Sequence, residues 1–300
     1  MIDPKLYTLL AVTEHGSYTR AAEQLSLTQP AVTQHIKQLE RELGIKIFNR
    51  TGNEIKPTNE GAIAIRYARR IIALYQKLEQ SLTDERRHTR RLTVGVTHTA
   101  ESNAITETLG RYCTKNPGTT ITIVTDSINN LYDMLKNYEL DLAIVESRSQ
   151  DEGINSLMLD TDSLVLAVSN NHPLARRSMI TINELRREPL ILRRPSSGTR
   201  SLFEAHLESQ NISLDDFNVI LEVDNVATIK DLIRRDIGVS ILPRSACADE
   251  LKKKKMAVLS IENLSMVREI NILYHRDFRH TDILQALARE YVRTASSYSY

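Results

Sequence analysis

The chain has 300 residues, of which 41% are hydrophobic and 26% charged, and its formal net charge is +1. These proportions are typical of globular proteins and exclude a disordered or fibrous chain, while the length favours two or three domains. The sequence contains no apolar run of about 18 residues and no basic-then-apolar N-terminal signal, so we expect no membrane association. The two cysteines, Cys113 and Cys247, lie far apart, which favours free, buried thiols in the reducing cytoplasm.

The charge is unevenly distributed along the chain. Residues 1–91 carry 15 Lys and Arg against 10 Asp and Glu, a net of +5, whereas residues 92–300 carry 24 against 28, a net of −4. A basic N-terminal third favours a polyanionic partner. Solvated helix faces often have a similar excess, so charge alone does not establish this partner.

Three short helices are predicted at the N-terminus. The first has leucines at helical spacing and ends at Gly16, and the second covers residues 18–25 behind the capping residue Ser17. The third covers residues 28–43, with Thr28 as its cap and Pro30 in its first turn, where a missing N–H is tolerated. This order indicates a helix-turn-helix motif over residues 18–37.

The third helix has two distinct faces. One face is apolar and is formed by Val32, Ile36, Leu39 and Leu43. The other presents side chains that can bind DNA: glutamine can bond an adenine edge, threonine a base edge or the thymine methyl, and lysine a phosphate. The side chains predicted on this face are Gln29, Thr33, Gln34 and Lys37.

A hairpin is predicted after the third helix. Residues 45–48 and 55–57 form its strands around a turn at residues 51–54, and Arg50 and Lys56 are placed to contact the DNA backbone. A three-helix core that binds protein, or nothing, is the alternative. The combination of polar helix face, wing and following basic helix favours a winged helix-turn-helix domain at residues 1–58 that binds double-stranded DNA.

A long helix is predicted over residues 59–87, capped by Thr58. Two seven-residue series lie along it and form a seam typical of a dimer interface, although the helix could also pack on its own domain. The series consist of Ala64, Ile71 and Leu78, and of Ala68, Tyr75 and Leu82, with Ile65 and Ile72 beside them. We therefore expect a linker and dimerisation segment at residues 59–91, in which residues 84–91 form a hinge.

Strands and helices alternate from residue 92 onward. This pattern predicts an α/β effector-binding domain at residues 92–300 with a largely parallel sheet. Residues 156–168 are predicted as two adjacent strands that interrupt the alternation, and a return is expected near residues 266–269. We therefore predict lobe I at residues 92–161 and 268–300 and lobe II at residues 162–267.

Ligand-binding segments are expected where strands of the α/β domain end. Hydroxyls, guanidinium groups and helix amides gather there and suit a small carboxylate, sulfate or phosphate-like molecule. The candidate residues are Thr97, His98, Thr99, Ser127, Arg193, Ser196 and Thr199. Alternatively, Ser197 and Thr199 only cap a helix and His98 is structural.

Signatures of catalysis are missing from the sequence. The histidines have no zinc-binding spacing, and the G-x-S-x-G, P-loop and G-x-G-x-x-G motifs do not occur. We therefore predict no enzymatic activity, no metal and no cofactor. The alternative is an α/β enzyme or solute-binding module that carries an unrelated helical adaptor.

Several segments closely resemble the LysR-type transcriptional regulators. The likeness is specific over residues 1–61, and looser segments follow downstream; the segments that carry it are residues 17–25, 28–33, 39–44, 48–50, 57–61, 197–200 and 238–243. The resemblance implies a winged helix-turn-helix, a dimerising linker helix and a two-lobed effector domain like periplasmic binding proteins. It also implies a regulator, activator or repressor, that forms dimers or dimers of dimers and responds to a small co-inducer.

The resemblance also assigns roles to individual residues. Groove contacts map onto Gln29, Pro30, Thr33 and Gln34, and the wing contact onto Arg50. The position aligned with Gln34 is often arginine in relatives, so the base preference of this chain can differ from theirs. Co-inducer contacts map onto Thr97, Thr99, Ser127 and Ser196, and promoter DNA and RNA polymerase are the implied macromolecular partners.

Overall fold

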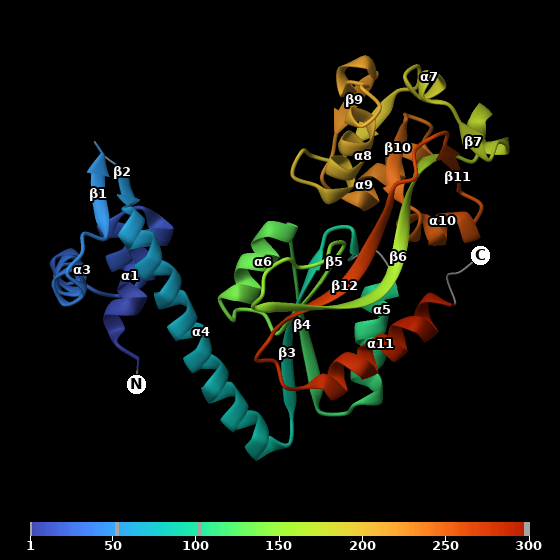
Figure 1. Cartoon of the computed structure of the whole chain (residues 1–300). Helices are drawn as coiled ribbons and strands as arrows, with labels where there is room; N and C mark the ends of the chain where they lie inside the picture. Colours follow the sequence, from blue (N-terminus) through green and yellow to red (C-terminus); the bar gives the residue numbers. More distant parts are fainter. Residues whose placement is uncertain (1, 52–53, 101–103, 297–300) are drawn as a thin grey trace. The chain divides into compact units, whose positions relative to one another are not determined.

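The computed structural model describes residues 2–51, 54–100 and 104–296, excluding the side chains of residues 50, 51 and 54 (Figure 1). These residues form two compact units: the first runs to Arg90 and also includes Asn137–Glu139, and the second begins at Arg91 and contains the rest. Within the described ranges, no helix combines the length and apolar character needed to cross a membrane.

Three helices open the first unit: α1 (Pro4–His15), α2 (Tyr18–Gln24) and α3 (Gln29–Leu43). Both α1 and α3 end at a glycine in the left-handed conformation, Gly16 with φ +59° and Gly44 with φ +67°. These ends lie where the sequence places them, because the stop signal is local.

Side-chain caps determine where the three helices begin. The side chains of Asp3, Ser17 and Thr28 accept backbone N–H bonds from the first turns of α1, α2 and α3, respectively. The apolar faces of the helices then pack into one core, which contains Leu9, Val12, Ala21, Ala22, Val32, Ile36 and Leu39. Leu43 was expected in this core, but it is 53% exposed because it lies in the last turn of α3, beyond the packed helices.

A two-stranded hairpin follows α3. Strand β1 (Phe48–Thr51) pairs antiparallel with β2 (Glu54–Pro57). The first strand begins at Phe48 and not at Ile45, because Ile45 still donates its N–H to the Glu40 carbonyl at the helix end. Of the turn predicted at residues 51–54, Thr51 and Glu54 belong to the two strands, and residues 52–53 lie outside the described residues.

Helix α4 (Asn59–Arg87) has the predicted limits, with the Thr58 side chain accepting from the Gly61 N–H at 2.8 Å. The predicted seam is only partly correct. Ile65 and Ala68 are buried in the core of the first unit, so they cannot face another chain. The exposed apolar side chains of α4 instead form a stripe three or four residues apart, consisting of Ile63, Tyr67, Ile71, Leu74, Leu78 and Leu82.

The expected hinge at residues 84–91 is mostly regular structure. Helix α4 continues to Arg87, His88 closes it in the left-handed conformation, and strand β3 (Arg90–Thr97) begins two residues later. The connection between α4 and β3 is short because His88 ends the helix abruptly and β3, which pairs with β5, begins at Arg90.

Lobe I of the second unit contains a mixed sheet with strand order β4-β3-β5-β12-β6, in which β6 is Ile154–Ser169. Helices α5 and α11 cover one face of this sheet and α6 covers the other (Figure 1). The remaining elements are β4 (Thr119–Asp126), β5 (Leu142–Val145), β12 (Val267–His275), α5 (Ala104–Lys115), α6 (Ile128–Lys136) and α11 (Thr281–Ala295).

Lobe II continues the sheet in the order β6-β10-β8-β9, with β11 pairing with β6 and β7. Its strands are β7 (Met179–Ile180), β8 (Leu190–Leu192), β9 (Val219–Glu222), β10 (Val239–Pro243) and β11 (Met256–Ile261). Its helices are α7 (Ile182–Leu185), α8 (Gly198–Glu208), α9 (Val226–Arg234) and α10 (Ala248–Lys252), with short 3₁₀ turns at Pro173–Arg176, Leu214–Asp216 and Ser245–Cys247.

A single long strand passes through both lobes. The two strands expected within residues 156–168 are one, β6 (Ile154–Ser169), which pairs with β12 in lobe I and with β10 and β11 in lobe II (Figure 1). Both β6 and β12 run antiparallel to their neighbours, so the sheet is mixed and not largely parallel. Strands β7 and β11 and helix α7 were not predicted.

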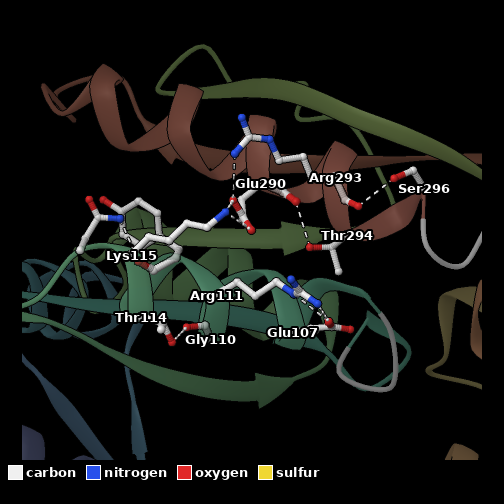
Figure 2. A network of polar contacts seen from close by, with 11 residues as sticks. Glu107, Gly110, Arg111, Thr114, Lys115, Glu290, Arg293, Thr294 and Ser296 are labelled. Atoms are coloured by element: carbon white, nitrogen blue, oxygen red, sulfur yellow. Dashed lines mark hydrogen bonds and ion pairs between the residues drawn. The ribbon is translucent and has the colours of Figure 1, made fainter.

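A buried carboxylate ties α5 to α11 (Figure 2). The Lys115 ammonium donates to both oxygens of Glu290, at 2.9 and 2.6 Å, and the Glu290 side chain is only 6% exposed. Thr294 donates its hydroxyl to the Glu290 carbonyl. This pairing gives the buried carboxylate the partner that its burial requires.

Both cysteines are free. Cys247 is buried, and burial raises the pKa of its thiol to about 12. Cys113 is only half-buried, which corrects the expectation that both thiols are buried.

Candidate functional site

The polar face of α3 is exposed. Gln29, Pro30, Gln34 and Lys37 are exposed, whereas Thr33 is half-buried. The Gln29 side-chain amide donates to the Thr33 hydroxyl at 2.9 Å, which orders the two side chains relative to one another. The face therefore presents amide groups and an ammonium in an arrangement suited to a DNA groove.

The wing supplies the other predicted cations. The backbone of Arg50 lies in β1, but its side chain is outside the described part of the chain. Lys56 lies in β2 and is exposed.

A cleft of about 380 Å³ lies in the second unit, between segments of both lobes. Lobe I contributes the ends of β3, β4 and β5, and lobe II contributes the loop before α8. The cleft is lined by Thr97, His98, Thr99, Asp126, Ser127, Ile128, Asn130, Glu146, Arg193, Ser196, Ser197, Gly198, Leu202, Asp224 and Arg268.

Six of the seven residues predicted from the sequence line this cleft. Thr199 does not: it is 1% exposed, and its hydroxyl accepts from Arg268 at 3.5 Å. Sequence reasoning missed Glu146, Asp224 and Arg268. Glu146 directly follows β5, so the rule about strand ends could have found it, whereas Arg268 lies inside β12 and has no comparable signal.

Arg193 reaches from lobe II to lobe I. Its guanidinium donates to the Thr99 hydroxyl at 3.4 Å and to the Asp224 carboxylate at 3.3 Å. Burial lowers the pKa of Arg193, and Asp224 opposes this effect. The side chain is 3% exposed, but that of Asp224 is 46% exposed, so this cation is only weakly compensated.

Arg268 holds two buried carboxylates. Its Nη2 lies 3.3 Å from Glu146 Oε1 and 3.6 Å from Asp162 Oδ2, and the three side chains are 5–10% exposed. The second Glu146 oxygen accepts from the Thr97 hydroxyl at 2.7 Å. Glu146 Oε1 is within ion-pair distance of Arg268 but accepts no well-directed hydrogen bond.

Ser197 occupies the position before α8, where a serine usually caps the helix. Its side chain makes no capping bond, and its buried hydroxyl has no partner within the protein. The interpretation of Ser197 as a cap is therefore wrong. A hydroxyl that does not cap the helix is available to a ligand in the cleft.

Unsatisfied polar atoms concentrate at the cleft. In the described part of the chain, five buried side-chain atoms lack a hydrogen-bond partner, and four of them belong to cleft residues: Glu146 Oε1, Arg193 Nε, Ser197 Oγ and Arg268 Nε. Each such atom costs on the order of 1–3 kcal/mol. Their clustering indicates a site prepared for a polar ligand. Among the described residues, no group of His, Cys, Asp and Glu could hold a metal ion.

Two family models cover nearly the whole chain. Residues 4–62 match the bacterial regulatory helix-turn-helix protein, lysR family, and residues 85–296 match the LysR substrate binding domain. The chain belongs to the LysR family. It is therefore a transcription regulator, and the alternative of an enzyme with a helical adaptor finds no support among its relatives.

Individual relatives agree with this assignment. A probable RuBisCO transcriptional regulator of Thalassiosira pseudonana is 29% identical over 273 residues, which are 89% of each protein. The solved structure of full-length CbnR with its target DNA covers 98% of this LysR-family chain and 100% of its own, with TM-score 0.68 and 20% identity. The CcmR regulatory domain of Synechocystis PCC6803, in complex with 2-PG, covers 67% of this chain and 97% of its own, with TM-score 0.60 and 25% identity.

Proposed function

We propose that this LysR-family regulator binds promoter DNA through α3 and the wing, and that a small anionic co-inducer binds the cleft between its lobes. The observation that carries the DNA proposal is the exposed polar face of α3, opposite a face buried in the core. CbnR, whose fold this chain shares, has been solved with its target DNA, which supports the same role here.

The ligand part of the proposal rests on the four unpartnered atoms at the cleft. The CcmR regulatory domain, a relative of similar fold, has been solved in complex with 2-PG, which supports a small-molecule site. The ligand-contacting residues we propose are the predicted Thr97, His98, Thr99, Ser127, Arg193 and Ser196, joined by Ser197, Glu146 and Arg268. Thr199 acts indirectly, by holding Arg268.

We expect Gln29→Ala to relax base preference and Lys37→Ala to weaken binding to all DNA sequences alike. Losing the glutamine contact removes on the order of 1–3 kcal/mol of discrimination at one base pair. Losing the lysine removes one phosphate contact and lowers the slope of log K against log salt by about 1. Gel shifts with the protein's own upstream region and with scrambled DNA, at several salt concentrations, measure both effects.

The matched control is Gln76→Ala, an exposed glutamine on α4 away from the proposed DNA face. It should leave DNA binding unchanged. If the wild-type protein showed no sequence-preferring binding, the proposed function would be wrong. If both α3 variants altered only base preference, the assignment of roles would be wrong.

We also propose that α4 forms a dimer through its exposed apolar stripe, with RNA polymerase as a further partner of the bound regulator. We propose the domain limits 1–58, 59–91 and 92–300, with lobes that meet near residues 161 and 268. A dimer would cover side chains such as Leu78, 53% exposed, and Leu82, 52% exposed.

Leu78→Asp is expected to weaken dimerisation by at least about 100-fold. Each buried leucine contributes about 1.5–3 kcal/mol, and a symmetric interface loses two of them. Sedimentation equilibrium measures the dissociation constant. Gln76→Asp, which adds the same charge to the opposite side of α4, should leave it unchanged, and equal effects of both variants would contradict the proposed interface.

A further inference from the structure

The charges around the cleft are separated. Arg268 faces two buried carboxylates, Glu146 and Asp162, so this cluster carries one surplus negative charge. Arg193 is paired directly with Asp224, whose side chain is 46% exposed and therefore screened by water, and the Glu146 carboxylate acts on Arg193 only through space, without a hydrogen bond. Positive charge is thus least compensated at Arg193, and negative charge is least compensated at Glu146.

The lobe II wall offers hydrogen-bond donors to an anion. Arg193 has an unpartnered buried Nε–H, and Ser197 has a buried hydroxyl that caps nothing. Arg193 directly follows β8, and Ser197 directly precedes α8, an 11-residue helix whose first residue, Gly198, also lines the cleft. Donors and helix dipole together favour one carboxylate or phosphate at this place.

The lobe I wall offers an acceptor. Glu146 is 10% exposed, receives one bond from Thr97, and has a second oxygen that accepts no hydrogen bond. An ionised carboxylate can only accept, so it requires a donor and repels another anion. Asp126 lines the same wall and adds to the repulsion.

We propose that the effector is a molecule with one anionic group, bound at Arg193 and Ser197, and a hydroxyl or ammonium at its other end that donates to Glu146. Doubly acidic molecules of the same length bind less tightly, because Glu146 repels the second anionic group. This inference rests on the proposed ligand-binding function of the cleft.

The test uses full-length protein and four probes with a four-carbon backbone: 4-hydroxybutyrate, 4-aminobutyrate, butyrate and succinate. Thermal shift and calorimetric titration give the order of affinities, because a ligand of the folded state raises its melting temperature. We expect 4-hydroxybutyrate or 4-aminobutyrate to bind at least about tenfold more tightly than succinate, the loss expected from one unfavourable charge contact. The comparison between the first two probes identifies which donor is preferred.

Glu146→Gln keeps the shape of the side chain and removes its charge. This variant should bind succinate about tenfold more tightly than the wild type does. It should therefore lose the wild type's preference for 4-aminobutyrate over succinate. Glu208→Gln, an exposed carboxylate on α8 outside the cleft, is the matched control and should leave the order unchanged. Ser197→Ala should weaken all four probes by a similar factor without changing their order.

Three results would overturn the inference: succinate binding as tightly as both donor-bearing probes, an unchanged order of affinities in Glu146→Gln, or no binding of any probe. Gel shifts of the same preparations separate these results from a failure of the proposed function. If DNA binding and its sensitivity to Gln29→Ala persist, only the ligand class is wrong.

Discussion

Replacing Gly61 with alanine should severely destabilise the winged helix-turn-helix unit. A Cβ at this position would lie 2.0 Å from the Ile47 carbonyl oxygen and 2.8 Å from its carbon, and these backbone atoms cannot rotate away. The same carbonyl accepts from the Thr58 N–H at 2.9 Å, so moving it also disturbs the start of α4. We expect the free energy of unfolding to fall by about 3 kcal/mol or more, which is at or above the upper end of the range usual for an overpacked core.

Gly110→Ala is the control for this variant. Gly110 lies within α5, and a Cβ there would meet nothing within 4 Å. Alanine should therefore stabilise the helix by roughly 0.5–1 kcal/mol. Chemical denaturation followed by circular dichroism, with a gel shift as the readout of the first unit, measures both variants. Similar stabilities for the two would show that the contact with Ile47 relaxes at little cost.

Arg268→Met should destabilise the second unit by about 3–5 kcal/mol, the range measured when one partner of a buried ion pair is removed. The substitution leaves Glu146, 10% exposed, and Asp162, 5% exposed, without their shared cation. It also removes the contact with Thr199 and thus loosens the wall of the cleft. Urea denaturation of the full-length protein measures the change.

Two further variants isolate the electrostatic cause. Arg268→Met combined with Glu146→Gln should recover part of the lost stability, since one of the two unpaired charges is gone. Arg234→Met removes an exposed arginine paired with Asp231 on α9 and should cost less than about 1 kcal/mol. Equal losses in Arg268→Met and Arg234→Met would mean that the buried charges are better solvated than their burial implies.

Local signals predicted most helix limits. Thr58 and the end at Arg87 define α4 as expected, and Gly16 and Gly44 end α1 and α3. Such limits depend on a capping side chain or a left-handed residue within a few positions, so the sequence contains all the required information. The same holds for the cleft residues at strand ends, because the topology of alternating strands and helices brings those ends together.

Long-range packing accounts for the errors. Leu43 and Ala68 follow the correct helical periodicity, but Leu43 is exposed and Ala68 is buried, because the packing of the first unit covers Ala68 and leaves Leu43 uncovered. The two strands expected within residues 156–168 are one, because β6 is held by different partners in each lobe. Periodicity describes which residues share a face, and it does not specify what covers that face.

The amino-acid sequence by itself determined the helix-turn-helix, its polar recognition face and the segments that border the cleft. Only the tertiary structure decided that Ser197 caps nothing, that Thr199 supports the wall from behind, and that Arg268 and Glu146 belong to the site. The first group depends on caps and periodicity, which act over a few residues. The second depends on which charges are buried together, and Arg268 meets Glu146 and Asp162 only after three distant strands have joined one sheet.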